Sequence, residues 1–115
     1  MVNRVFILGR MGQKPEVKHT ANGQAIANIS IATTEKFSDK QGNKQEKTEW
    51  HRVVAFGKQA EIIGEYTDKG SKIYVEGKIQ TRSYEKDGIT HYSTEVIVND
   101  FRLLDSKKEQ QDAPF

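Results

Sequence analysis

The sequence contains no cysteine, only two prolines and no long hydrophobic run. Without cysteine the chain can form neither a disulfide nor a thiolate metal site, which is consistent with a reducing cytosol. A membrane-spanning helix needs roughly 18 or more consecutive apolar residues, and neither such a run nor a signal-peptide pattern occurs. We therefore expect a cytoplasmic chain without a membrane partner.

Hydrophobic residues are also scarce, at 35% of the 115 residues. This length is typical of one domain with one core, and the low apolar share indicates a large polar surface. The formal net charge of +2 is too small to indicate a nucleic-acid partner by itself. The distribution of the charges along the chain is therefore more informative than their sum.

The residue types that commonly act in catalysis or bind metal ions do not form a recognisable motif in this sequence. His19, His51 and His91 are scattered, and no His-x-Glu motif or cysteine pair could hold zinc. The glycines at Gly9 and Gly12 lack the spacing of a phosphate-binding loop. We expect no enzyme activity, no cofactor and no metal.

The hydrophobic periodicity is mostly two, as in half-buried strands. Strands are predicted from an apolar run at Val2–Leu8, which Pro15 stops, and from the alternations that begin at Gln24, Thr48, Lys72 and Thr90. Phe37 follows the second of these strands, at the base of a polar loop. Apolar residues three apart predict one short helix between Lys58 and Tyr66, and Asp87-Gly88 indicates a tight hairpin.

The element order is therefore three strands, one short helix and two strands. This order is that of an all-β fold, the OB-fold, a five-stranded Greek-key barrel that commonly binds oligonucleotides. Sandwich folds usually have more strands, and a parallel α/β sheet needs more helices.

The strand that contains the only tryptophan carries an unusual face. Residues two apart share a face of a strand, so Trp50, Arg52, Val54, Phe56 and Lys58 lie on one side and His51 on the other. Aromatic rings interleaved with cations suit single-stranded nucleic acid, because the bases stack on the rings while the cations contact the phosphates. A half-buried strand, with Trp50 and Phe56 in the core, is the alternative.

The fourth predicted strand repeats this pattern. Its polar side carries Lys72, Tyr74, Lys78, Arg82 and Tyr84, again mixing rings with cations. Two such strands in one small barrel favour a nucleic-acid surface, although a solvated charged face is the alternative.

Several sequence blocks occur together and in a fixed order. They are Gly9–Val17, Asn22-Gly23, Ala27–Thr33, Thr48–Val54, Phe56–Lys58, Lys69–Ser71, Val75–Gly77 and Thr94–Val96. Together these blocks resemble the bacterial single-stranded DNA-binding protein family. The similarity covers about Val2 to Leu104, and we therefore assign residues 1–104 to one OB-fold domain. The resemblance implies a homotetramer that binds and protects single-stranded DNA, without sequence preference, during replication, recombination and repair.

The resemblance also implies roles for individual residues. His51 matches a position at a subunit contact. The implied stacking rings are Phe37, Trp50, Phe56 and Tyr84. The implied cations that contact the DNA backbone are Arg4, Lys18, Arg52, Lys58, Lys69, Lys78 and Arg82.

Residues 105–115 depart from the family pattern of a long linker and a strongly acidic tip. Here the stretch is short and polar, and it ends in Asp112-Ala113-Pro114-Phe115. We expect a flexible tail in which Asp112, Pro114 and Phe115 dock weakly onto replication and repair proteins. A short chain of this kind is consistent with an accessory, plasmid or phage member.

Two other binding proteins on the same fold remain open. One is a primosome-type OB dimer that handles DNA at restarted forks, and the other is a protein-interaction barrel with no DNA role. The number of subunits tests the first alternative, and the response of Trp50 to an oligonucleotide tests the second.

Overall fold

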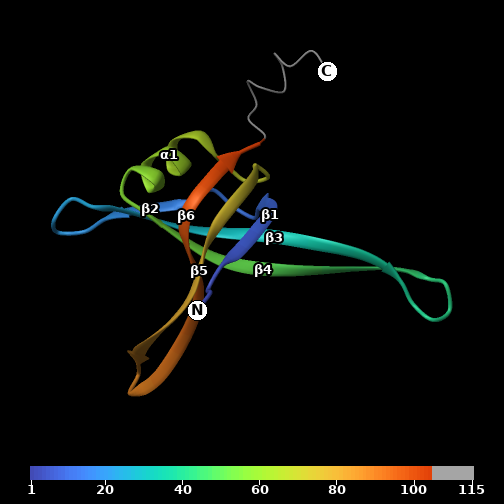
Figure 1. The fold of residues 1–115 in the computed structure, drawn as a ribbon. Coiled ribbons are helices and arrows are strands. Elements are labelled where there is room, and N and C mark those ends of the chain that lie inside the picture. Colours follow the sequence, from blue (N-terminus) through green and yellow to red (C-terminus); the bar gives the residue numbers. More distant parts are fainter. Residues whose placement is uncertain (105–115) are drawn as a thin grey trace, which may run out of the picture.

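Six β-strands and one α-helix form residues 1–104, the part of the chain that the computed structural model describes. Asp112, Pro114 and Phe115 lie outside the described residues, so their docking role stays a prediction. In chain order the elements are β1 (Val5–Met11), β2 (Glu16–His19), β3 (Ala25–Ser38), β4 (Lys44–Phe56), α1 (Lys58–Tyr66), β5 (Lys72–Lys86) and β6 (Ile89–Leu103) (Figure 1).

Five of the strands close into a barrel. The strand order is β1-β5-β6-β4-β3-β2, and an additional pairing between β1 and β3 completes the ring. All the pairings are antiparallel except that of β4 with β6, which runs parallel at Val53–Val96 and Val54–Ile97. This topology, with α1 between β4 and β5, confirms the predicted five-stranded OB-fold.

The structure extends the predicted strands in two places. Glu16–His19, directly after Pro15, forms β2, a short edge strand paired with Ala25–Asn28 of β3 that the sequence analysis did not predict. Phe37 lies next to the loop, as predicted, but it belongs to β3, which continues to Ser38 and pairs with β4 from Ile26 onward. Backbone hydrogen bonds extend a hairpin through polar residues without any hydrophobic pattern, which is why periodicity missed this continuation.

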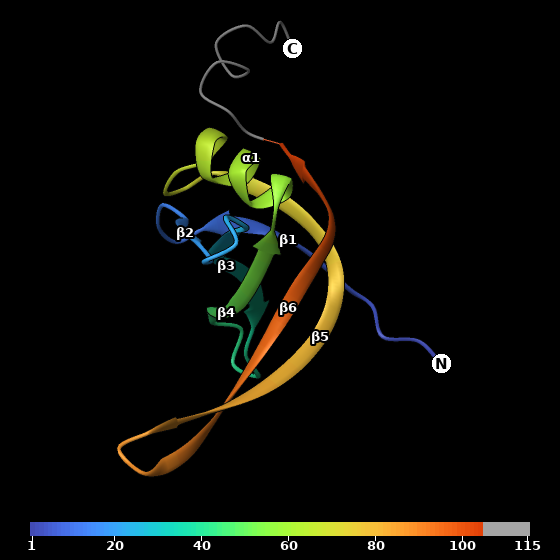
Figure 2. The ribbon, with the colours of Figure 1, turned by 90° about the vertical axis from the view of Figure 1, so that its left-hand side faces the viewer.

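The barrel interior holds the hydrophobic core. Ile31, Ile63, Ile73 and Val75 are completely buried there. The helix α1 lies over one end of the barrel, where Ala60 and Ile63 face the core (Figure 2). Strand β5 curves strongly around the other elements in the same view. Because successive side chains of a strand point to opposite faces, the side chains that alternate with the core residues lie on the outer surface of the barrel.

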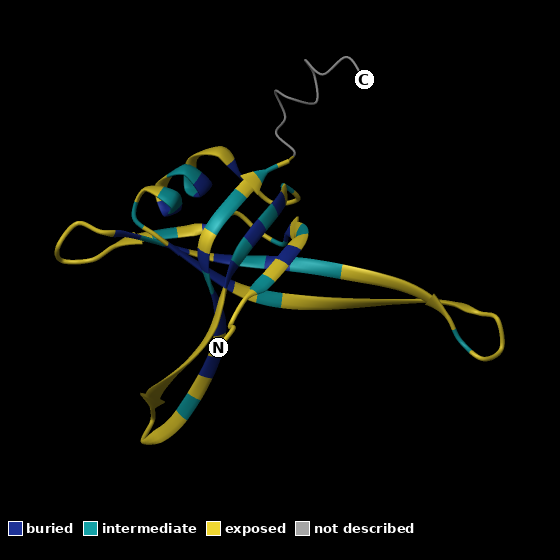
Figure 3. Cartoon of the chain, in the orientation of Figure 1, coloured by how far each residue is buried: buried dark blue, intermediate teal, exposed yellow. Residues whose placement is uncertain are grey.

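Two hairpins continue beyond the barrel as arms. We call residues 34–49 of β3 and β4 the β3–β4 arm, and residues 79–92 of β5 and β6 the β5–β6 arm. The arms point in different directions, and nearly all their residues are exposed (Figure 3). Both arms begin at strands that close the barrel, so the barrel sets their starting directions.

Asp39 organises the turn at the end of the β3–β4 arm. Its Oδ1 accepts hydrogen bonds from the backbone N–H of Asn43 at 2.8 Å and of Gln41 at 2.9 Å. These bonds, chiefly that from Asn43, lower the pKa of the Asp39 carboxyl below its ordinary value. The Asp39 carboxylate thus accepts backbone hydrogen bonds at the point where the chain reverses and strand pairing ends.

We predict that Asp39→Ala loosens the arm tip without unfolding the barrel. Because the folded state lowers this pKa, the stabilisation is fully present above the unfolded pKa and is lost as pH falls through the folded one. Amide hydrogen exchange at Gln41 and Asn43, corrected for intrinsic rates, should increase in the variant, whereas exchange at Val53 should not. Unchanged exchange at the turn would contradict the role of Asp39.

Candidate nucleic-acid interface

The predicted face of β4 lies on the outer surface of the barrel. Val53 and Ala55 are buried in the core, whereas Trp50 is 59% exposed and Phe56 is 39% exposed. The alternative that placed both rings in the core is therefore wrong. Val54 lies between them on the outer side but is buried.

Trp50 rests on the backbone of the loop after β1. It pairs with Ala32 of β3, and its ring extends across that strand to Gly12. A Cβ atom at Gly12 would lie only 2.3 Å from Cζ3 of Trp50, so only glycine leaves room for the ring in this position. The N–H of Gly12 donates to the carbonyl of Ser30 at 3.0 Å, which ties the loop to β3. The indole is thus supported from below yet accessible to a ligand.

Two arginines lie on the outer surface on either side of β6. Arg52 of β4 donates from Nη1 to Oγ of Ser93 at 3.2 Å. Arg82 of β5 donates from Nε to Oε1 of Glu95 at 3.0 Å, and the Glu95 side chain is only 10% exposed. Both arginines and Glu95 line one concavity of about 350 Å³. The hydrogen bond and charge of Glu95 raise the pKa of Arg82, which is charged in any case.

Tyr84 adds a ring at the next outward position of β5. The Arg82 guanidinium carbon lies 5.8 Å from the centre of this ring, which is within cation–π range. Tyr84 also shares a second concavity, of about 600 Å³, with Trp50 and Arg52. Four of the predicted DNA-binding residues, Trp50, Arg52, Arg82 and Tyr84, are therefore brought together.

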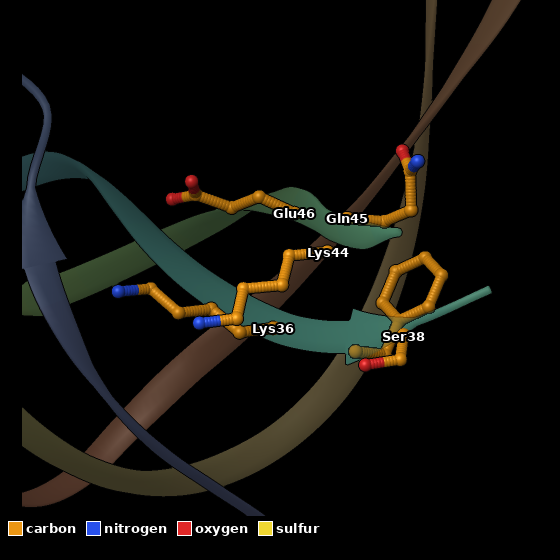
Figure 4. A pocket seen from close by; sticks show the side chains of 6 residues that line it. Lys36, Ser38, Lys44, Gln45 and Glu46 are labelled. Carbon is orange, nitrogen blue, oxygen red and sulfur yellow. The ribbon is translucent and has the colours of Figure 1, made fainter. Parts of the chain in front are cut away.

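Phe37 lies apart from this group, on the β3–β4 arm. It pairs with Gln45, and its odd position puts it on the ribbon face opposite Trp50. A concavity of about 460 Å³ at the arm tip is lined by Phe37 with Lys36 and Lys44. Figure 4 shows the Lys36 and Lys44 side chains running in a similar direction from the two strands.

Three further predicted residues lie towards the other end of β4. Phe56 and Lys18 both pair with Ile26, so they flank it on the outer face, and Lys18 also contacts Glu16 at 2.9 Å. Lys58 is exposed at the start of α1, immediately after this strand. The outer surface thus continues from Trp50 to the helix.

Lys69 belongs to the loop before β5. The neighbouring Gly70 donates its N–H to the carbonyl of Met11 at 2.8 Å. Lys69 is exposed there. Because Gly70 bonds to Met11, Lys69 lies near the Gly12 loop that supports Trp50.

Arg4 and Lys78 form a separate pair. They line a different concavity, of about 420 Å³, together with Asn3 and Asn99. The concavities around Trp50 do not include them. The structure therefore does not place these two cations with the main group.

His51 faces away from Trp50, as the alternation predicts, and is half-buried. Its Nε2 lies 2.8 Å from the hydroxyl oxygen of Thr33 on β3, at hydrogen-bond distance. Its proposed role at a subunit contact stays a prediction.

Residues that the sequence analysis missed complete the surface. Gly12 supports the tryptophan, while Ser93 and Glu95 hold the two arginines from β6. Ser93 is a neutral polar residue and Glu95 is acidic, so neither carried the aromatic or basic signal by which the other site residues were chosen. A register count from Asp87-Gly88 would have placed Ser93 opposite Arg82.

Among residues 1–104, no group of three or more His, Asp or Glu side chains could hold a metal ion. None of the helices in this range is long and apolar enough to cross a membrane.

Comparison with known proteins identifies the family. A profile described as the single-strand binding protein family matches residues 2–104. The chain belongs to this family. Its membership of a family of binding proteins confirms that the chain is not an enzyme.

Two solved structures are similar in fold and sequence. The chain is 32% identical to a Plasmodium falciparum single-strand binding protein in complex with single-stranded DNA, with a TM-score of 0.82 over 91% of this chain and 96% of that one. It is 33% identical to a deletion mutant of the single-stranded DNA-binding protein from Thermus aquaticus, with a TM-score of 0.79 over 92% of this chain. The match spans 52% of that second protein.

The two arginines should respond differently to truncation. Arg52→Ala removes a cation whose partner, Ser93, is neutral, so DNA affinity and its salt dependence should fall while thermal stability changes little. Arg82→Ala leaves the nearly buried Glu95 carboxylate without its partner, so the melting temperature should fall as well. Each lost phosphate contact should lower the slope of log K against log salt by about 0.7.

The control for this comparison is the double variant Arg82→Ala/Glu95→Gln. It should recover the melting temperature without recovering the salt slope, since the unpaired charge is gone but the cation is still missing. Equal melting temperatures for Arg82→Ala and the unaltered chain would show that the ion pair does not contribute to stability.

Proposed function

We propose that the chain binds single-stranded DNA without sequence preference and protects it during replication, recombination and repair. The observation that carries this proposal is the exposed Trp50 ring, supported by Gly12 and sharing one concavity with Arg52 and Tyr84. The family match and the likeness to a DNA complex support it.

The geometry suits a flexible strand more than a duplex. The rings of Trp50 and Tyr84 are separate platforms on β4 and β5, and unpaired bases can reach each of them by bending the backbone. Arg52 and Arg82 line an adjoining concavity, which shares Arg52 and Glu95 with that of the two rings, and from there they can contact phosphates. None of these contacts reads the edge of a base, which is why we expect little sequence preference.

The other predicted cations and rings extend this path. We propose that Phe56, Lys58 and Lys18 contact the strand towards the helix, that Lys69 contacts it beside the Gly12 loop, and that Phe37 contacts it on the β3–β4 arm. Arg4 and Lys78 would meet the same DNA only if it also passes over their separate concavity.

Trp50 provides the direct test. Adding oligothymidylate should quench its fluorescence, and a duplex of equal length should barely change it. Trp50→Ala should weaken binding by about 1–3 kcal/mol, the range of one base-stacking contact. Gly12→Ala is the matched variant, because it displaces the ring without removing it and should weaken binding to an intermediate extent.

Unchanged affinity in Trp50→Ala, with an unchanged melting temperature, would exclude the ring from the binding surface. Absence of any response to oligothymidylate in the unaltered chain would instead favour the protein-interaction barrel.

A homotetramer is the assembly that we propose. On the outer face of β1, Phe6 is 64% exposed and Leu8 is 51% exposed, next to Glu76 and Tyr74 of β5. Two exposed apolar side chains on one strand form a surface that a second copy can cover. Several copies would let one DNA strand cross several binding surfaces, which raises affinity through effective concentration.

Molar mass by light scattering, with and without oligothymidylate, tests the assembly. We expect four chains in both samples, and Phe6→Glu should reduce that number because a buried charge opposes the contact. Phe6 also lines the concavity of Trp50, Arg52 and Tyr84, whereas Leu8 lies outside both concavities. Leu8→Glu is therefore the matched variant, which should also reduce the number of chains but retain weakened binding. A dimer would favour the primosome-type alternative, and a stable monomer would refute assembly.

The proposed ligand also suggests a cellular setting. Because this ligand is single-stranded DNA, we propose that the chain acts in the cytoplasm with the nucleoid. Docking of replication and repair proteins on Asp112, Pro114 and Phe115 rests on the sequence alone, and Phe6→Glu or Trp50→Ala should not affect it.

A further inference from the structure

The turn between β5 and β6 puts a histidine opposite Tyr84. Asp87 and Gly88 both have positive φ, 56° and 77°, as a two-residue hairpin turn of type I′ requires. This turn pairs Lys86 with Ile89, and the register therefore pairs Tyr84 with His91. Directly opposed residues point to the same face of a sheet. His91 thus lies on the outer face with the binding surface.

The two rings form a stack. Their centres are 5.3 Å apart and their planes meet at 19°, which is the geometry of an offset aromatic pair. Tyr84 remains 40% exposed, and His91 is half-buried. A ring pair of this kind presents more stacking area than one ring, and each ring limits the rotation of the other.

His91 also lies on the path between the two proposed platforms, Trp50 and Tyr84. Strand β6 is between β5 and β4 in the sheet, so His91 is on the β4 side of Tyr84. Two residues further along the same face, Ser93 holds Arg52 of β4. A DNA strand that runs from Trp50 to Tyr84 must therefore cross the outer face of β6.

The charges on this face favour a phosphate. Arg82 and Lys86 lie at the positions flanking Tyr84 on β5, and Arg52 reaches β6 from β4. Glu95 is the acidic residue on the same face of β6, and it is already paired with Arg82. A protonated imidazole at His91 would add a further cation to this group.

We propose that His91 is a DNA-contacting residue that acts in two ways. Its ring extends the Tyr84 platform for base stacking, and in its protonated form it contacts a backbone phosphate. Affinity for single-stranded DNA therefore increases as pH falls through the range in which imidazole gains its proton. This inference rests on the proposed DNA-binding function and adds one residue and a pH dependence to it.

Two substitutions separate the ring from the charge. His91→Phe keeps a flat ring beside Tyr84 but cannot be protonated, whereas His91→Ala removes both properties. At about pH 8, where most imidazole is neutral, His91→Phe should bind oligothymidylate as the unaltered chain does. His91→Ala should bind at least about fivefold more weakly, the lower end of a stacking contact.

The pH profile distinguishes direct contact of His91 with DNA from a role in which His91 only supports the Tyr84 ring. Between about pH 8 and about pH 5.5 the unaltered chain should gain more affinity than His91→Phe. His19 and His51 are present in both proteins, so the difference between the profiles isolates His91. The double variant Tyr84→Ala/His91→Ala should lose less binding free energy than the sum of the two single losses, because both substitutions affect the same stacking platform.

Two results would overturn the inference while leaving the proposed function intact. One is His91→Ala binding as tightly as the unaltered chain with an unchanged melting temperature. The other is identical pH profiles for the unaltered chain and His91→Phe. Failure of the unaltered chain to bind oligothymidylate at any pH would overturn the proposed function itself.

Discussion

The parallel pairing of β4 with β6 is the contact on which the proposed binding surface depends. It joins Val53 to Val96 and Val54 to Ile97, and it closes the barrel between two strands that belong to different hairpins. Without it, the outer face of β4 would have no fixed position relative to β6. Arg52 could not reach Ser93, and Trp50 and Tyr84 would not share a concavity.

This closure also explains how a chain with little net charge can present a basic surface. Two acidic residues line the concavity of the arginines: Glu16 contacts Lys18, and Glu95 is nearly buried and is engaged by Arg82. Its charge orients that arginine, and the pairing reduces the repulsion that a free carboxylate would exert on phosphates. The cost is that Arg82 is not independent, because removing it leaves Glu95 without a partner.

The rings are prepared for stacking by different means. Trp50 is supported by a glycine backbone, where a methyl group would collide with the indole. Tyr84 is supported by the His91 ring on the opposite strand. A ring that is already held in place loses less conformational entropy when a base stacks on it, which favours binding.

Much of the local structure could be predicted from the sequence. Alternation placed Trp50, Arg52 and Phe56 on one face, because a strand has a period of two whatever it pairs with. The Asp87-Gly88 turn determined the pairing of Tyr84 with His91, although that consequence was not drawn from the sequence. Phe37 is in phase with the odd positions of β3, so its side of the strand could be read from the sequence, but the continuation of the strand to Ser38 could not, since the polar residues around it carry no hydrophobic pattern.

The sequence by itself determined the strand faces, the helix, the hairpin turn and the family. Only the tertiary structure decided which outer faces lie side by side, because that depends on pairings between residues about forty positions apart, such as Val53 with Val96. It separated Arg4 and Lys78 from the main surface and assigned Gly12, Ser93 and Glu95 to it. Periodicity reports how a segment meets its own neighbours, whereas a binding surface is made where distant segments meet each other.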